Sequence, residues 1–318
     1  MTAPRRLRVA AAQWPIEPHA SLAAWGDKLE RWLAAAAAGR AQLAVIPEYA
    51  AMELTSVLSQ AAQGDLERQL HELQDLLPEV HERCRAAAQR HDLYLLASSL
   101  PEAAATRFVN RLRLWSPRGA HVTVDKLHMT RFERERWGIV EGAGQHVIDT
   151  EHARLGVAIC YDSEFPLQVR RLAAAGAEVI LVPSCTDSLA GYHRVRVACQ
   201  ARALENQCYV IQAPTVGLAP WSLAVDENRG QAGVYGPPDR GFPEDGVVAQ
   251  GERDRAQWLF AELDLEAVAA VRADGQVLNH RDWATDDEQA DSQADEQTNA
   301  APRTGPPWAR SRPSLVRL

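Results

Sequence analysis

The sequence has 318 residues, 46% of them hydrophobic and 24% charged, a composition typical of a soluble globular protein and unlike that of a collagen or a disordered chain. Its net charge of -8 argues against non-specific binding of nucleic acid. No apolar run reaches the ~20 residues that a membrane-spanning helix needs, so we expect no membrane segment.

The amino-terminal end does not have the pattern of a secretory signal. The apolar stretch after its basic residues is interrupted by Gln13 and Pro15.

The cysteines are odd in number and have no paired spacing, so the sequence predicts reduced thiols and a cytoplasmic location. Without Cys-x-x-Cys or His-x-x-x-His spacing, we expect neither a zinc site nor any cofactor. The cysteines are Cys84, Cys160, Cys185, Cys199 and Cys208.

Strands and helices are predicted to alternate along most of the chain. A strand at residues 7–13 precedes a helix at 21–38, in which apolar residues recur every three or four positions. Further strands are predicted at 42–46, 94–98, 154–159, 178–182 and 208–212, and helices at 66–89, 165–175 and 192–206. This alternation indicates an α/β fold, a sheet covered by helices. Hairpin-like pairs near 107–126 and 230–264 indicate mixed strand directions. Pro78 could break the second helix.

The composition changes after Ala284, which suggests a main domain at residues 1–284 and a tail at 285–318. The tail is first acidic and then rich in proline and arginine, with few apolar anchors. It is predicted to be largely disordered, although Trp308 and Leu315 could dock on the body or on a neighbouring subunit.

Three short segments follow strand candidates, at the edge where reactive groups collect in open α/β sheets. They are Val45-Ile46-Pro47-Glu48-Tyr49, Val124-Asp125-Lys126-Leu127-His128 and Val157-Ala158-Ile159-Cys160-Tyr161-Asp162. A cysteine between a strand and a helix is expected to expose its sulfur and to have a stabilised thiolate. The plain alternative for Cys160 is a buried structural cysteine.

Glu48 and Lys126 also have ordinary interpretations, as a surface cap and as a lysine that extends into water. Near a thiol, however, Glu48 could serve as a general base if burial raises its pKa. In a closed pocket, the fixed cation of Lys126 could stabilise an oxyanion.

The order of the three motifs resembles that of the nitrilase superfamily, the carbon–nitrogen hydrolases, over about residues 7–265. The resemblance implies a four-layer αββα sandwich with Glu48 as general base, Lys126 as transition-state stabiliser and Cys160 as nucleophile. Many members have a second glutamate that positions the substrate. Glu135, seven residues before Gly142, is the better match for it, and Glu133 is the competitor.

Several further residues are candidates for the substrate pocket. The backbone N–H of Tyr161 could help to hold the oxyanion, and Cys185 could line the pocket because it ends a neighbouring strand. Tyr49 and Glu164, and also Trp137 and Tyr192, could shape it. The loops at 50–63, 186–192 and 215–229 are expected to set its form.

The resemblance implies hydrolysis of a small amide or carbamoyl compound through a cysteine thioester. Cys-Tyr-Asp at residues 160–162 is typical of the amidase side of the superfamily, so nitriles are the weaker alternative. The segment after Lys126 is also similar to a branch linked to N-acyltransferases, whose extra acetyltransferase domain we do not expect in 318 residues.

Three other interpretations remain open. His128, two residues beyond Lys126 on the same strand face, could act as base in a cysteine–histidine pair. The chain could be a non-catalytic interaction protein on the same fold, which the presence of all three expected residues disfavours. A metal hydrolase has no support from ligand spacing. The resemblance further implies a homodimer or a larger homo-oligomer.

Overall fold

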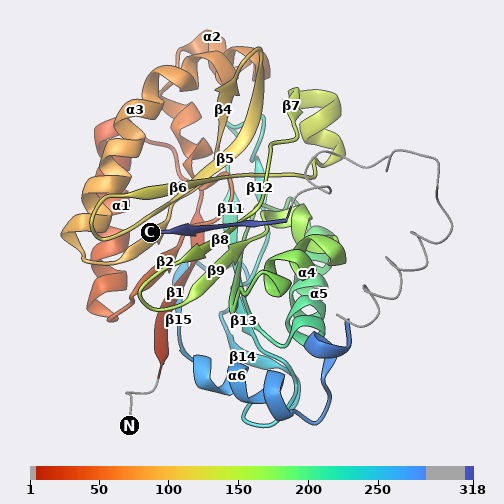
Figure 1. Cartoon of the computed structure of the whole chain (residues 1–318). Helices are drawn as coiled ribbons and strands as arrows, with labels where there is room; N and C mark the ends of the chain where they lie inside the picture. Colours follow the sequence, from red (N-terminus) through yellow and green to blue (C-terminus); the bar gives the residue numbers. More distant parts are fainter. Residues whose placement is uncertain (1–4, 284–311) are drawn as a thin grey trace, which may run out of the picture.

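The computed structural model describes residues 5–283 and 312–318 (Figure 1). Two mixed β-sheets lie face to face, and helices cover the outer face of each (Figure 1). This is the four-layer αββα sandwich that the family resemblance implies, and its strands run in mixed directions as expected.

The first sheet is built around β1 (Arg6–Pro15), which pairs in parallel with β2 (Leu43–Val45) and antiparallel with β15 (Gln257–Asp264). It continues through β3 (Tyr94–Leu96), β4 (Leu100–Ala104), β5 (Arg107–Trp115), β6 (His121–Asp125) and β7 (Ile139–Val140). Because side chains alternate along a strand, β1 serves two cores. Val9 packs between the sheets, whereas Ala10 and Trp14 pack beneath the outer helices.

The second sheet has a parallel centre of β9 (Arg154–Val157), β10 (Val179–Ser184) and β11 (Tyr209–Leu218). Its other strands are β8 (His146–Asp149), β12 (Glu227–Asn228), β13 (Gly233–Tyr235), β14 (Val247–Gln250) and β16 (Ser314–Arg317). The two sheets are joined at one corner, where Trp14 and Pro15 of β1 pair with Thr215 and Val216 of β11.

The outer face of the first sheet is covered by α1 (Leu22–Ala38) and α3 (Leu66–Arg90), and that of the second by α4 (Pro166–Ala174) and α5 (Leu189–Asn206). The remaining helical segments are η1 (Ala50–Val57), α2 (Gln60–Gln63), η2 (Glu133–Trp137), η3 (Cys160–Glu164) and α6 (Leu265–Asp274). None of the helices within the two described ranges has the length and apolar character needed to cross a membrane.

The observed elements confirm the predicted alternation and differ from it in two places. Helix α3 runs through Pro78 without a break, because this proline lies on its exposed side while Leu77 and Val80 anchor it to the core. The last residues of the tail are ordered, since β16 pairs in parallel with β8 and covers that edge of the second sheet. The expectation that Leu315 could dock on the body is confirmed, because it pairs with Val147 there. Trp308 and the rest of 285–311 lie outside the described residues.

Candidate active site

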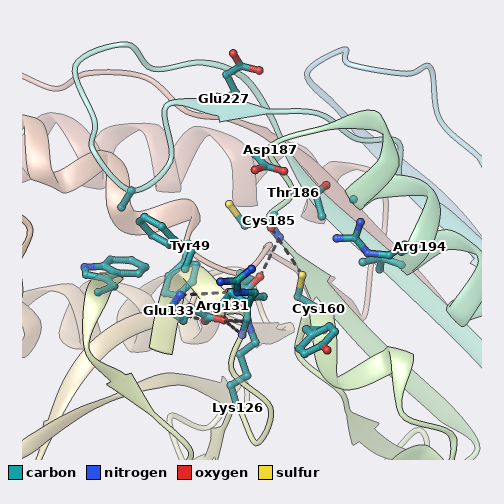
Figure 2. A pocket seen from close by; sticks show the side chains of 18 of the residues that line it. Tyr49, Lys126, Arg131, Glu133, Cys160, Cys185, Thr186, Asp187, Arg194 and Glu227 are labelled. Atoms are coloured by element: carbon teal, nitrogen blue, oxygen red, sulfur yellow. Dashed lines mark hydrogen bonds and ion pairs between the residues drawn. The ribbon is translucent and has the colours of Figure 1, made fainter. Parts of the chain in front are cut away.

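Glu48, Lys126 and Cys160 come from three separate segments of the chain and line one cavity of about 580 Å³. Figure 2 shows Lys126 and Cys160 in this cavity. Glu48 follows β2, Lys126 directly follows β6, and Cys160 comes shortly after β9 as the first residue of η3. All three are almost fully buried, with exposed fractions of 1%, 1% and 4%. The fold therefore brings together the three residues that the sequence motifs single out.

The ammonium group of Lys126 lies between two carboxylates. Its Nζ is 2.8 Å from Oε1 of Glu48, and 2.8 and 2.7 Å from Oε1 and Oε2 of Glu133. Glu133 also accepts hydrogen bonds from the hydroxyl of Tyr49 at 2.8 Å and from the backbone N–H of Thr130 at 2.9 Å. A buried cation with this many acceptors has a fixed position, which an oxyanion-stabilising group requires.

The carboxylate of Glu48 is held by donors on both of its oxygens. Oε1 accepts from Lys126 and from Nδ2 of Asn110, each at 2.8 Å, and Oε2 accepts from the backbone N–H of Cys185 at 3.0 Å. The thiol of Cys160 donates to the backbone carbonyl of Cys185 at 3.7 Å, so Cys185 bridges the carboxylate and the thiol. The charge of Glu48 also acts on the pKa of Cys160, which places the carboxylate close to the thiol as a candidate base.

Two residues beside this cluster have left-handed backbone. Cys160 has φ of 48°, and Tyr49, which follows Glu48, has φ of 55°. Such a conformation costs a non-glycine residue of the order of 1–3 kcal/mol and is found mainly where the surrounding structure enforces it, often at functional sites. Here it turns the chain sharply at both the thiol and the carboxylate.

The two glutamates differ in their proton affinity although they share one lysine. Burial raises the pKa of Glu48, an effect that Lys126 only partly offsets and that nearby Glu133 reinforces. Burial acts in the same direction on Glu133, but Lys126 and the backbone of Thr130 outweigh it and lower the pKa of that carboxyl. Burial alone would lower the pKa of Lys126, but Glu133 and Glu48 raise it well above its ordinary value.

Cys160 is a buried thiol rather than an exposed thiolate. Burial raises its pKa well above the ordinary value, and the charge of Glu48 adds to the effect more than Lys126 opposes it. The prediction of an exposed, stabilised thiolate is therefore wrong, because burial and the charge of Glu48 raise the pKa of the thiol more than Lys126 lowers it. A thiol with a raised pKa needs a base to take its proton as it reacts, and Glu48 is the carboxylate that acts on its pKa.

Glu133, not Glu135, lies in the site. Glu133 is buried in contact with Lys126, whereas Glu135 is on the surface and forms an ion pair with Arg131 at 3.0 Å. Residues two positions apart in a helix point to nearly opposite sides, so η2 can present only one of the two glutamates to the cavity. The choice of Glu135 over Glu133 from sequence is wrong for this reason.

His128 is not placed as a base for the thiol. Its ring stacks on Phe165 with ring centroids 3.6 Å apart, and its Nδ1 lies 3.0 Å from Oδ1 of Asp162. The same Asp162 carboxylate accepts hydrogen bonds from the backbone N–H groups of Leu127 at 3.2 Å and His128 at 2.7 Å. Asp162 thus connects the segment that carries Lys126 to the turn that carries Cys160.

The candidate pocket residues from the sequence all line the cavity: Tyr49, Tyr161, Glu164 and Cys185. Trp137 also lines it, whereas Tyr192 is buried beside it with its hydroxyl bonded to Gln231 at 2.9 Å. Of the expected loops, 186–192 and 215–229 contribute to the cavity, and 50–63 does not.

Within the described part of the chain, no group of three metal-ligating side chains is present.

The model of one protein family, described as carbon-nitrogen hydrolase, matches residues 8–273, which is most of the chain. The chain belongs to the carbon–nitrogen hydrolase family. Within this family, a "Probable hydrolase YhcX" from Bacillus subtilis is 29% identical over 280 residues, which cover 88% of this chain and 54% of that protein. A "Deaminated glutathione amidase" from Rattus norvegicus is 44% identical over 134 residues, which cover 42% of this chain and 38% of that protein. This carbon–nitrogen hydrolase spans about half the length of the curated relatives it matches.

Solved structures of this family share its fold. A carbon–nitrogen hydrolase from Helicobacter pylori superimposes with a TM-score of 0.68 at 22% identity, covering 85% of this chain and 92% of that one. A mutant of the amidase from Nesterenkonia sp. AN1 superimposes with a TM-score of 0.65 at 20% identity, covering 87% of this chain and 99% of that one. That structure is described as carrying acrylamide added to its active-site cysteine. At these identities the likeness concerns the fold alone.

Sequence reasoning missed several residues of this carbon–nitrogen hydrolase site. Asn110, on β5, donates hydrogen bonds to both glutamates from the middle of a strand. Asparagine is depleted in strands, so its position within a strand of the predicted 107–126 hairpin was a usable signal. Charged residues at the cavity mouth, which had no comparable signal, are Arg131, Asp187, Arg194, Asp226 and Glu227.

Proposed function

We propose that this carbon–nitrogen hydrolase cleaves the C–N bond of a small non-peptide amide or carbamoyl compound through a thioester on Cys160. The observation that carries the proposal is that Glu48, Lys126 and Cys160 line the same cavity. The Glu48 carboxylate lies 2.8 Å from the Lys126 ammonium and accepts the backbone N–H of Cys185, whose carbonyl accepts the Cys160 thiol at 3.7 Å. A nucleophile, a base and a fixed cation thus meet at one cavity large enough for a small molecule.

Acylation begins when the sulfur of Cys160 attacks the carbonyl carbon of the amide, while Glu48 takes the thiol proton. The carbonyl electrons move to oxygen, and the resulting oxyanion is stabilised by the ammonium of Lys126 and the backbone N–H of Tyr161. The C–N bond then breaks, and Glu48 returns its proton to the departing nitrogen. Ammonia or an amine leaves, and the acyl group remains on sulfur as a thioester.

Deacylation reverses these proton movements. Glu48 takes a proton from water, and the water oxygen attacks the thioester carbon. The C–S bond breaks, the sulfur takes the proton back from Glu48, and the acid leaves. Glu48 acts alternately as base and acid, for which a pKa above the ordinary glutamate value is suited.

Relatives support amides over nitriles as substrates. Several curated relatives are named deaminated glutathione amidase. The Cys-Tyr-Asp sequence at 160–162 indicates the same preference. We therefore rank small amides and carbamoyl compounds first, with deaminated glutathione among the amides to be tried.

The test is a screen for ammonia release from small amides, ω-amides, carbamoyl compounds and nitriles. We expect turnover of at least one amide or carbamoyl compound, its loss in Cys160→Ala, and its retention in Cys84→Ala, a buried cysteine of α3 outside the cavity. Although its pKa is raised, Cys160 should be labelled by iodoacetamide before the other thiols, because it lines the cavity and Glu48 is proposed to take its proton as it reacts. Ammonia from nitriles but not from amides would reverse the ranking, and a chain without turnover or preferential labelling would be a non-catalytic protein.

We also propose that the chain forms a homodimer or a larger homo-oligomer through the outer face of α4 and α5. Leu167 and Val197 are large apolar residues on these helices with exposed fractions of 59% and 64%. Exposed apolar side chains on adjacent helices suit a self-complementary contact. Light scattering after size exclusion should give at least twice 35.0 kDa for the wild type and a smaller mass for Leu167→Glu combined with Val197→Glu. A monomeric wild type would contradict the proposal.

A further inference from the structure

Asn110 is a fully buried side chain that contacts both glutamates of the site. Its Nδ2 donates to Oε1 of Glu48 at 2.8 Å and lies 3.3 Å from Oε1 of Glu133. Its backbone carbonyl accepts the N–H of Lys126 at 2.9 Å. One residue of β5 therefore touches all three charged members of the cluster, although it does not line the cavity.

The orientation of the Asn110 amide is set by its charged neighbours. Two carboxylates face its NH₂ group, and the opposite orientation would place the amide oxygen against them. Its Oδ1 is buried and has no hydrogen-bond partner among the described residues. An unpaired buried acceptor lowers the stability of the folded protein, so the two hydrogen bonds that the NH₂ group donates to the glutamates must offset this cost.

Asn110 also determines which part of Glu48 is available to the thiol. Oε1 of Glu48 already accepts from Lys126 and Asn110, which fills its two acceptor positions. Oε2 accepts one backbone N–H, from Cys185, and keeps one position free. The carbonyl of the same Cys185 accepts the thiol of Cys160 at 3.7 Å, so the oxygen with the free position is linked to the thiol through one residue.

We propose that Asn110 is a positioning residue, whose amide fixes the Glu48 carboxylate with one free acceptor position towards the thiol and keeps it ionised beside Glu133. The inference rests on the proposed function, because it assigns to Asn110 the task of holding Glu48, the base of the proposed mechanism. A hydrogen bond donated to a carboxylate favours the ionised form, so its loss shifts the ionisation of Glu48 to higher pH. Asn110 does not touch the substrate, so kcat should fall more than KM rises.

The experiment compares the pH dependence of kcat/KM for wild type, Asn110→Ala and Asn110→Asp. Asn110→Ala removes the Nδ2 donor, so the acidic limb of the kcat/KM profile should move to higher pH by about one unit. We also expect kcat to fall about tenfold. Asn110→Asp should move the limb further, because it adds a third carboxylate to the cluster. Asn206→Asp is the matched control, since Asn206 is equally buried but donates to the carbonyl of Arg202 instead.

A second measurement makes the two proposals separable. The rate at which iodoacetamide alkylates Cys160 is followed against pH without substrate, with thermal unfolding used to verify that each variant is folded. If the wild type hydrolyses an amide but both Asn110 variants keep its acidic limb and alkylation profile, the Asn110 inference alone is overturned. If wild-type Cys160 neither labels preferentially nor supports turnover, the proposed function and the inference fail together.

Discussion

Lys126 holds Glu133 through both carboxylate oxygens, at 2.8 and 2.7 Å from Nζ, but meets Glu48 through one oxygen only. The asymmetry matches the opposite pKa changes of the two glutamates, because the fully paired Glu133 keeps its charge and the partly paired Glu48 binds a proton more readily. Two carboxylates whose environments separate their pKa values are suited to different tasks. Glu133 is placed to anchor the lysine, and Glu48 to exchange protons.

The first expectation concerns the two glutamates that the sequence could not separate. Glu133→Gln removes the charge that holds Lys126, so we expect kcat to fall at least 10²-fold, the typical effect of disturbing an oxyanion-stabilising group. Glu135→Gln removes only an exposed ion pair with Arg131 and should leave kcat within about twofold. Steady-state kinetics on the best substrate of the screen measure both, and equal losses in the two variants would contradict the assignment.

The second expectation is the pH profile of the wild type. The proposed mechanism needs ionised Glu48, and the raised pKa of this carboxyl places the acidic limb of kcat/KM above the ordinary value of 4.5. The pKa of Lys126 is raised well above 10.5, so its ammonium persists and the profile should stay level to at least pH 9. A rate that rises with the deprotonation of a free thiol near pH 9.0 would show instead that Cys160 reacts as a preformed thiolate.

The sequence predicted the features that depend on local pattern, and missed those that depend on tertiary contacts. Glu48, Lys126 and Cys160 follow strands, and apolar periodicity located those strands. Glu133 could not be separated from Glu135 because the orientation of a short helix is set by the groups it packs against, here Lys126 and Tyr49. The protonated state of Cys160 depends on a carboxylate more than a hundred residues away in sequence, and β16 depends on pairing with distant β8.

The third expectation concerns Asp162, which joins the Lys126 segment to the Cys160 turn. Its carboxylate accepts two backbone N–H groups, from Leu127 and His128, as well as Nδ1 of His128. Asp162→Asn replaces one acceptor oxygen by an NH₂ group that would face these donors. We expect kcat to fall about tenfold and stability by about 1–3 kcal/mol, the usual cost of an unpaired buried group.

Kinetics and urea unfolding of Asp162→Asn measure the two effects. Asp149→Asn is the matched control, because Asp149 lies on β8 away from the cavity and forms ion pairs with the exposed side chains of Arg154 and Arg317. A loss of stability with unchanged kcat in Asp162→Asn would mean that the link supports the fold and not the alignment of the catalytic groups.

The last expectation tests a buried ion pair outside the cavity. Nζ of Lys28 in α1 lies 2.7 Å from Oε2 of Glu53 in η1, and both side chains are almost completely buried. Lys28→Met leaves the Glu53 charge without its main partner, so we expect a loss of about 3–5 kcal/mol in the free energy of unfolding. Lys28→Met combined with Glu53→Gln should recover most of that loss, because no unpaired charge remains.

The matched control for Lys28 is Arg90→Met, which removes a pair with Glu30 that joins α3 to α1 on the surface. Exposed pairs contribute about 0–1 kcal/mol, so this change should be several times smaller. Urea unfolding measures all three variants, and kcat should be unchanged in each because neither Lys28 nor Arg90 lines the cavity. If Lys28→Met destabilises no more than Arg90→Met, the ion pair is not what holds α1 to η1. Water or a rearranged side chain would then compensate the charge of Glu53. The contact between the two helices would depend on apolar packing around Trp25 and Met52.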